Sequence, residues 1–190
     1  MGDLFNHIDP ALERFIRSQR VFFVATAPLS AEGHVNLSPK GLDTLRILGP
    51  QTLAYLDYVG SGAETIAHLR ENGRIIIMLC AFQGPPRIVR LHGRGEALEP
   101  QDDDFDQLRT QFPATPSGRA IIRVTLERIS DSCGYGVPLL AFEKDRSQLS
   151  NWSERKGAQG LLEYQKKNNS SSIDGLAALR WPQHTSGQAE

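Results

Sequence analysis

Two apolar segments joined by a proline-rich turn constrain the fold of this 190-residue chain more than any other feature. Residues 74–82 (RIIIMLCAF) form a nearly continuous apolar run that is short enough for a central strand. Gly84-Pro85-Pro86 then excludes a helix, because proline lacks the backbone N–H that a helix interior needs. Residues 87–98 alternate between polar and apolar side chains, as a strand with one covered face does. Together these segments predict two strands around a rigid turn.

Further short segments repeat this pattern of strand and turn. β-Branched and aromatic residues predict additional strands at 20–27, 35–37, 45–48, 52–57 and 120–129. Turn signals stand at residues 31–33 and at Gly49-Pro50-Gln51, each between two of these strands. About six or seven strands with only short helices between them favour a mainly β, antiparallel barrel over a doubly wound parallel sheet.

Helix signals lie between and after the strands. Asp9 and Pro10 predict a short helix near the start of the chain, since aspartate caps a helix and proline suits its first turn. A helix is expected over 62–71, ending at Asn72-Gly73. Three aspartates should open another over 102–112. Two more helical patterns span 145–156 and 160–167.

The change of pattern after the last strand predicts the domain organisation. We expect a barrel domain over residues 1–130 and a C-terminal loop and helical extension over residues 131–190 that packs on it. The polar end of the chain, from about residue 184, should be disordered.

Composition excludes several kinds of partner and site. The formal net charge is −1, which gives no reason to expect nucleic acid or an anionic membrane as a partner. We find no secretory leader and no apolar run near the length of a membrane span, so we expect a cytoplasmic protein. Cys80 and Cys133 are too few for a disulfide framework, and the five histidines lack ligand spacing, so no metal site is expected.

One stretch combines a cationic strand end with a helix start. Residues 36–41 (NLSPKG) end a strand and carry Lys40, and the following strand breaks at residues 60–62 (GSG). A helix start has free backbone N–H groups and a partial positive charge that small residues let an anion approach. Ser61 and Thr65 add hydroxyl donors. The stretch predicts a phosphate-binding corner; a plain turn and a solvated surface lysine are the alternative interpretations.

Other catalytic motifs are missing from the sequence. The G-x-G patterns at 60–62 and 93–95 lack the third glycine of a dinucleotide fingerprint and lie in no βαβ unit. Neither a Walker A motif nor a G-x-S-x-G elbow is present. His92, on one strand face with Arg90 and Arg94, is either a proton donor or an ordinary strand histidine.

The ordered segments VNLSPKG, YLDYVGSGAETIAHLRENGRIIIML and RIVRLHGRGEAL resemble the pyridoxamine 5'-phosphate oxidase-like family of flavin-binding split β-barrels. The resemblance covers roughly residues 21–124. It implies FMN in a groove of the barrel at a homodimer interface, with the flavin ring against the strand at 35–40. By match to the family, the flavin neighbours are Asn36, Leu37, Ser38, Lys40, Tyr58 and Val59. Lys40 lies near the ring or substrate and is the catalytic candidate.

The chain departs from the oxidase proper at the phosphate. Glu64 and Thr65 stand where that enzyme has Arg-Lys. An acid beside a phosphate is unfavourable, so the helix start with Ser61, Gly62 and Thr65 would have to compensate, or Arg87 or Arg90 would have to restore positive charge.

The second departure lies in the C-terminal extension. The oxidase's Arg-x-His substrate clamp has no counterpart, and residues 151–157 read NWSERKG. Trp152 either stacks on the flavin or a substrate, or anchors a helix. We therefore expect an FMN-dependent oxidoreductase that acts on a small molecule other than a B6 vitamer. A deazaflavin-dependent reductase on the same barrel, and a non-enzymatic flavin-binding, flavin-sensing or structural dimer, remain open.

Overall fold

The structure is a computed structural model that describes residues 2–181. Its centre is an antiparallel sheet in which seven strands follow the order β3-β2-β6-β7-β8-β5-β4. Their bounds are β2 Phe22–Thr26, β3 Asn36–Lys40, β4 Leu45–Gly49, β5 Thr52–Tyr58, β6 Arg74–Cys80, β7 Ile88–Leu98 and β8 Gly118–Ser132. The two-residue β1 (Leu4–Phe5) pairs with β8 as an eighth strand. The prediction of a mainly β, antiparallel fold with short helices is confirmed.

The sheet curls but does not close, because its end strands β3 and β4 do not pair with each other within residues 2–181. An ion pair spans the gap instead. Lys40 Nζ, on β3, lies 2.8 Å from Asp57 Oδ1, on β5, which is the neighbour of β4. The barrel is therefore open at one side, and a polar contact holds the two ends of the sheet together.

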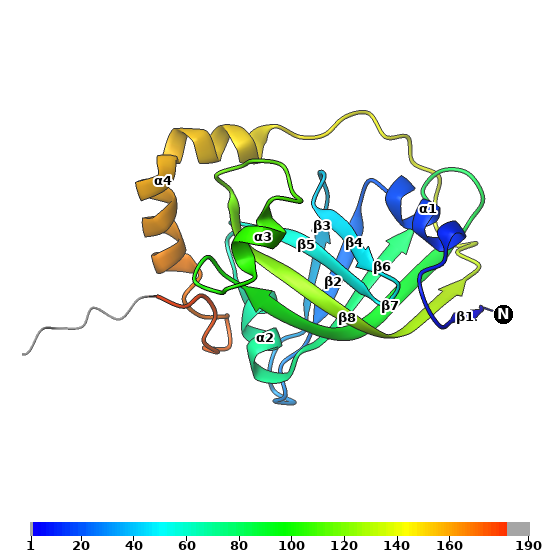
Figure 1. Ribbon diagram of the computed structural model, residues 1–190, viewed down its shortest axis with the longest axis horizontal. Helices are drawn as coiled ribbons and strands as arrows, with labels where there is room; N and C mark the ends of the chain where they lie inside the picture. Colours follow the sequence, from blue (N-terminus) through cyan, green and yellow to red (C-terminus); the bar gives the residue numbers. More distant parts are fainter. Residues whose placement is uncertain (1, 182–190) are drawn as a thin grey trace, which may run out of the picture.

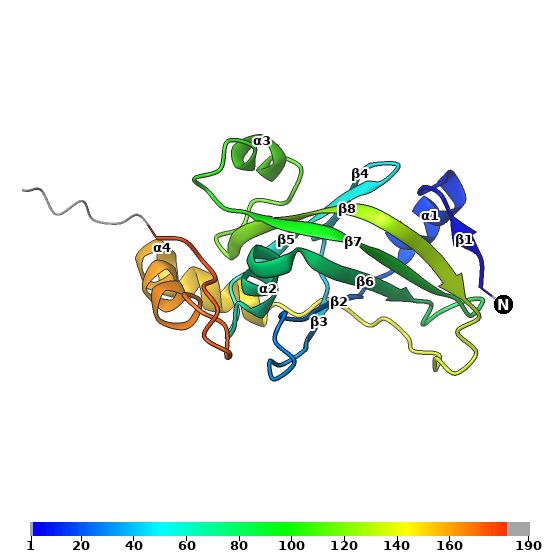
Figure 2. The same ribbon diagram turned by 90° about the horizontal axis from the view of Figure 1, so that it is seen from below.

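Two hydrophobic cores cover the two faces of the sheet. The larger core fills the inside of the curl and contains Tyr55 and Ile122 together with residues of α1 and α2. The smaller core lies on the other face, where Phe105 and Phe112 cover Leu56. Figure 2 shows α3 and α2 on opposite sides of the β7–β8 pair. Since β5 lies between both cores, its consecutive residues are buried, unlike those of a strand with one wet face.

α1 begins, and α2 ends, at the residues that predict it, whereas α2 begins two residues after the predicted start at 62. α1 (Pro10–Ser18) follows Asp9, whose Oδ1 accepts a hydrogen bond from Leu12 N at 2.7 Å. α2 (Glu64–Asn72) ends at Gly73, whose φ of 70° is a left-handed conformation that glycine adopts readily. Local capping chemistry thus sets the start of α1 and the end of α2.

The helix predicted over 102–112 is wrong in its length. α3 covers only Phe105–Arg109. Asp102 Oδ2 accepts a hydrogen bond from the backbone N of Glu99 at 2.8 Å, and Asp104 makes no side-chain cap. The aspartates therefore form a turn before the helix, because their side chains compete for nearby backbone donors.

The C-terminal residues wrap around the barrel as a strap and a bent helix. We call residues 133–147 the strap; it runs along one side of the molecule from the end of β8 to α4 (Figure 1). α4 (Gln148–Asn168) bends at Gly157, whose φ is 63°, so the two predicted helices form one kinked helix. Asn169 Nδ2 donates to Gly60 O at 3.0 Å and fastens the helix end to the loop after β5.

Two predictions concern the C-terminal part of the chain. β8 continues to Ser132, two residues beyond the predicted domain boundary at 130. The tail predicted from residue 184 lies outside the described residues. None of the helices in residues 2–181 is long and apolar enough to cross a membrane.

Candidate functional site

β3 is an edge strand with one polar row of side chains. Asn36, Ser38 and Lys40 pair with the three buried residues of β2 and so face the inside of the sheet. Leu37 and Pro39 face the outside, and both are exposed. The strand predicted at 35–37 therefore extends to Lys40, and the residues expected to touch a flavin ring divide between its two faces.

The backbone of β3 leaves a definite set of groups free at the open edge. Pro39 has no N–H, so its pair with Phe23 is of the kind that makes no ladder hydrogen bonds. By the alternation of antiparallel pairs, Leu37 opposite Ala25 also turns its N–H and C=O away from β2. The open edge thus presents an acceptor at Pro39 and both a donor and an acceptor at Leu37.

A buried ion triad fixes the end of β3. Asp57 is fully buried, and its two carboxylate oxygens each lie 2.8 Å from a cation, Oδ1 from Lys40 Nζ and Oδ2 from Arg119 Nε. Burial opposes ionisation, but the charges of Arg119 and Lys40 outweigh it and lower the pKa of Asp57 to about 2. Lys40 uses one of its three N–H donors on Asp57, and its side chain remains 21% exposed.

A second polar network fixes the start of β3 against α2. Asn36 Nδ2 donates to Thr65 Oγ1 at 3.0 Å and to Thr26 Oγ1 at 3.2 Å, and Asn36 Oδ1 accepts from Ser38 Oγ at 3.0 Å. His68 Nδ1 lies 2.9 Å from the same Thr26 hydroxyl. Burial lowers the pKa of His68, so its ring is neutral at pH 7. Both ends of β3 are therefore held in place by buried polar contacts.

At the predicted phosphate-binding corner, the side chains are arranged differently from the prediction. Ser61 is exposed, Ala63 occupies the N-cap position of α2 without a side-chain cap, and Thr65 is buried with its hydroxyl bonded to Asn36. The carboxylate of Glu64 folds back over Gly62, because a Cβ at Gly62 would lie only 2.2 Å from Glu64 Oε2. The helix start thus holds a carboxylate of the protein itself.

Tyr58 and Val59 lead from β5 into this corner. Val59 is buried, and its backbone N donates to Ser117 O at 2.8 Å. Tyr58 is half-buried against the smaller core, and burial raises the pKa of its hydroxyl. Both residues act as packing elements that set where the corner lies.

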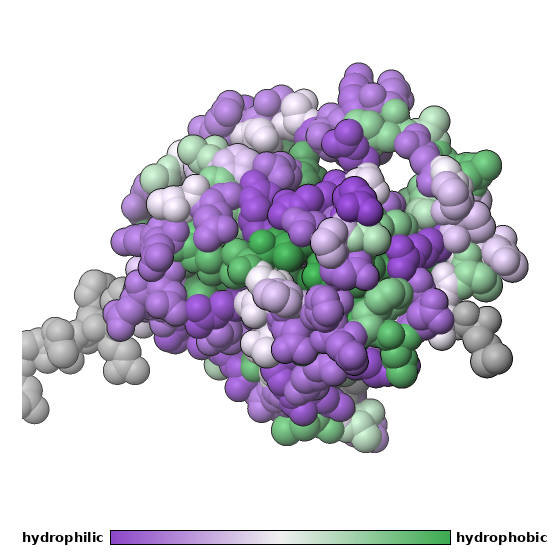
Figure 3. Space-filling model, turned by 45° about the vertical axis from the view of Figure 1, so that its right-hand side comes forward, coloured by the Kyte–Doolittle hydropathy of each residue, from purple (hydrophilic) through white to green (hydrophobic). Residues whose placement is uncertain are grey.

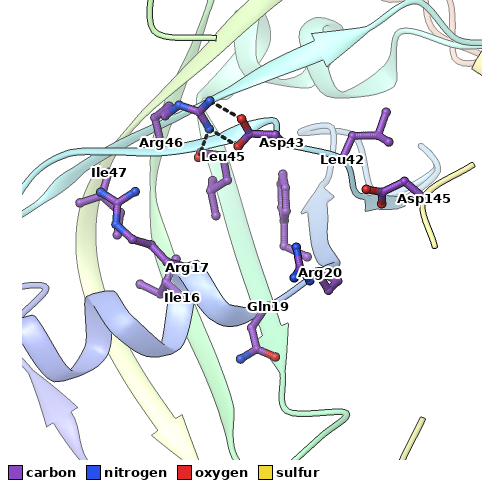
Figure 4. A pocket seen from close by; sticks show the side chains of 11 residues that line it. Ile16, Arg17, Gln19, Arg20, Leu42, Asp43, Leu45, Arg46, Ile47 and Asp145 are labelled. Atoms are coloured by element: carbon purple, nitrogen blue, oxygen red, sulfur yellow. Dashed lines mark hydrogen bonds and ion pairs between the residues drawn. The ribbon is translucent and has the colours of Figure 1, made fainter. Parts of the chain in front are cut away.

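Two cavities flank the end of β3. One, of about 500 Å³, is lined by Pro39, Lys40 and Leu42 and, across from them, by strap and α4 residues 144–149. The other, of about 260 Å³, lies between α1 and β4 (Figure 4). Three arginines line the second cavity: Arg46 pairs with Asp43 through two hydrogen bonds, Arg17 bonds Glu13, and the Arg20 guanidinium lies 5.0 Å from the centroid of the Phe142 ring. The first cavity, which contains Lys40, is the better candidate for a small molecule.

Three residues of the predicted site lie elsewhere. Arg87 bonds Asp131 at 2.9 Å, and Arg90 bonds Ser132 at 2.9 Å, both near the start of β7. α2 packs near Gly95 at the far part of that strand, so neither arginine reaches the corner within one chain. Trp152 packs edge-to-face on Tyr164 within α4, with ring centroids 5.0 Å apart.

Asp57 and Arg119, which fix Lys40, were not predicted from the sequence. A signal for Asp57 was present: in the strand LAYLDY it shares the inward parity of Leu53 and Tyr55, and a carboxylate at a core position needs a cation. Arg119 gave no such signal, because it follows a loop and only the register of β8 brings it to Asp57.

The residues around β3 and the start of α2 fit the ring of a flavin better than its phosphate. The free backbone groups of Leu37 and Pro39 suit the polar edge of a planar ring, and the adjoining cavity leaves room beside Lys40. The helix start does not suit a phosphate, because Glu64 already places a negative charge there. Within the described residues, no cluster of three or more His, Cys, Asp or Glu side chains suits a metal ion.

Comparison with known proteins agrees with the fold. A family model described as pyridoxamine 5'-phosphate oxidase matches residues 8–133. The pyridoxamine 5'-phosphate oxidase family protein ustO of Aspergillus flavus is 38% identical over 205 residues, which cover 99% of this chain and 82% of that protein.

Solved structures show the same fold at low sequence identity. A variant of HupZ from Group A Streptococcus has a TM-score of 0.52 at 20% identity and covers 66% of this chain and 99% of its own. A candidate pyridoxamine 5'-phosphate oxidase from Lactobacillus delbrueckii has a TM-score of 0.50 at 18% identity and covers 66% of this chain and 94% of its own. The matched sequence and the shared antiparallel sheet lead to one conclusion: this chain belongs to the pyridoxamine 5'-phosphate oxidase family.

Proposed function

We propose that this protein is an FMN-dependent oxidoreductase that binds the flavin ring at the open edge of β3. The observation that carries the proposal is this edge, which polar contacts hold at both ends and which leaves free a donor and an acceptor at Leu37 and an acceptor at Pro39. Family membership supports the same cofactor class. A bound flavin would supply hydride transfer through its ring.

In this proposal, the residues of the chain bind the flavin and orient it for the reaction. The Leu37 N–H and the C=O groups of Leu37 and Pro39 recognise the polar edge of the ring. On the other face of the strand, the hydrogen bond between the Asn36 and Ser38 side chains holds β3 in position. Lys40 is the catalytic candidate, because it retains free N–H donors beside the cavity and can direct one to a reacting oxygen or nitrogen. The cavity between Lys40 and the strap receives the small substrate.

Replacing Leu37 by proline tests this edge directly. Proline removes the one N–H that the edge offers to the ring, and its fixed φ suits an edge strand. We expect flavin affinity to fall about tenfold, the value of one good hydrogen bond. Titration of apoprotein with FMN, followed by quenching of flavin fluorescence, measures the change.

Leu37→Ala is the matched control, since it loses the same exposed side chain and keeps the N–H. It should bind FMN about tenfold more tightly than Leu37→Pro, because any effect of the lost side chain is common to both variants. Equal affinity in both variants would show that the ring lies elsewhere. The absorption spectrum of the wild-type protein as purified distinguishes an oxidised flavin from a deazaflavin, and a protein that binds neither would defeat the proposal.

We further propose that the protein is a homodimer with the flavin at the interface. Val35 and Leu37 expose large apolar side chains beside the β3 edge, and Leu139 and Leu140 do so on the strap. In Figure 3 the strap arches over the body, and apolar residues appear on the arch and in a recess of the face below it. Exposed apolar groups of this kind mark interaction surfaces.

Sedimentation velocity tests the dimer. We expect twice the 21.0 kDa of one chain at micromolar concentration. Leu139→Ser together with Leu140→Ser should shift the protein toward monomer, because both side chains are exposed in the single chain and contribute little to its core. A flavin-loaded wild-type monomer would contradict the proposal.

A further inference from the structure

The start of α2 contains its own anion. Glu64 is the first residue of the helix, and its side chain turns back toward the loop before it. A Cβ built on Gly62 would lie 2.2 Å from Glu64 Oε2, 2.8 Å from Oε1 and 2.9 Å from Cδ. The missing side chain at Gly62 therefore makes room for the carboxylate of Glu64, not only for a ligand from outside.

No side-chain hydrogen bond caps this helix end. Ala63 has no side chain that accepts a hydrogen bond, and the Thr65 hydroxyl accepts from Asn36 on the other side. A carboxylate near the first turn is favourable beside the partial positive charge of a helix start. A phosphate at the same place would meet the negative charge of Glu64 at close range, and like charges repel.

Three cations around β3 and β7 have carboxylate partners other than Glu64. Lys40 and Arg119 share Asp57, and Arg87 bonds Asp131 near the other end of β7. On the far side of the corner, the amide of Asn169 bonds Gly60 O, and the Lys166 ammonium lies 6.0 Å from the centroid of the Trp181 ring. Among these side chains, none forms a hydrogen bond or ion pair with Glu64.

We infer that Glu64 excludes external phosphate from the α2 corner, so that this protein selects its flavin by the ring and hardly distinguishes FMN from riboflavin. The first part concerns the corner alone. The second part rests on the proposed function, because it requires that a flavin binds. Glu64 is thus a residue that sets cofactor specificity by repulsion.

The first experiment uses inorganic phosphate and does not depend on flavin. Backbone amide signals of Glu64, Thr65 and Ile66 are followed by NMR during a phosphate titration of the wild type and of Glu64→Gln. The neutral amide of glutamine keeps the size of the side chain and removes its charge. We expect saturable shifts in Glu64→Gln and none in the wild type. Equal shifts in both proteins, or none in either, would overturn the inference.

The second experiment compares the dissociation constants of FMN and riboflavin. We expect the two flavins to differ by less than about threefold in the wild type, and FMN to gain about tenfold over riboflavin in Glu64→Gln. Glu32→Gln, the same charge change on the exposed β2–β3 turn, should leave the ratio unchanged. A wild-type preference for FMN of about a hundredfold would overturn the inference.

The two experiments separate the two proposals. If neither flavin binds any variant, the proposed function fails, and the phosphate titration still decides whether Glu64 closes the corner. If both flavins bind but Glu64→Gln changes neither the ratio nor the amide shifts, the proposed function stands and the role of Glu64 fails.

Discussion

Replacing Asp57 by asparagine should destabilise this protein by about 3 kcal/mol or more, because it leaves the charges of Lys40 and Arg119 without their buried partner. Asparagine keeps the size of the side chain, so the loss comes from charge and not from packing. For a chain of this size the change corresponds to a drop in Tm of roughly 10 °C. Thermal and urea unfolding, followed by circular dichroism, measure it.

Asp43→Asn is the matched control for this prediction. It removes the same charge from a pair with Arg46, but the Asp43 side chain is 70% exposed. An exposed pair contributes at most about 1 kcal/mol. A similar loss of stability in the two variants would show that burial does not determine the strength of the Asp57 triad.

The same triad predicts how stability depends on pH. The pKa of Asp57 is lowered from 3.8 to about 2 on folding, so its contribution is fully present above the higher value. That contribution is lost as the pH falls through the lower value. The wild type should therefore lose stability in this acid range more steeply than Asp57→Asn, which has no such group. Parallel acid-unfolding curves for the two proteins would contradict the assignment.

The second large effect should come from Gly93→Ala. Gly93 lies at the β-bulge where β7 shifts its register with β8, and an added Cβ would lie 2.1 Å from Thr125 O and 3.0 Å from Thr125 C. Both are backbone atoms of the neighbouring strand, so no side chain can move aside. We expect a loss of about 3 kcal/mol, at the upper end of the range for an overfilled core. Urea unfolding gives the value.

Two other glycines control for this clash. Gly136→Ala, on the strap, should be almost neutral, because an added Cβ meets nothing within 4 Å. Gly73→Ala has room but a φ of 70°, and should cost only about 1 kcal/mol. If Gly73→Ala costs more than Gly93→Ala, backbone conformation matters more here than the close approach of the strands.

The stability effect of Asp57→Asn bears on function because Asp57 lies next to the strand to which we assign the flavin. Asp57 holds the end of β3, and the network of Asn36 and Thr65 holds its start. The two contacts cross the opening of the sheet and join β3 to β5 and α2. Loss of either should loosen the edge to which we assign the flavin, so flavin affinity should fall together with stability in Asp57→Asn.

The sequence by itself determined the strands, the turns and the capped helices. The apolar run before Gly84-Pro85-Pro86 and the alternation after it predict β6 and β7, since the period of side-chain burial is a local property. Asp9 and Gly73 predict the start of α1 and the end of α2, because a cap is made within a few residues.

Only the tertiary structure decided which charged groups meet. Arg119 reaches Asp57 through the pairing of β5 with β8, and Lys40 reaches it across the opening of the sheet. Arg87 and Arg90, which the sequence allows near a phosphate, lie toward the other end of β7. Glu64 could be expected at the corner, but its turn back over Gly62 depends on the loop conformation. Contacts between distant segments follow from strand register and chain path, and neither is encoded by the local spacing of residues.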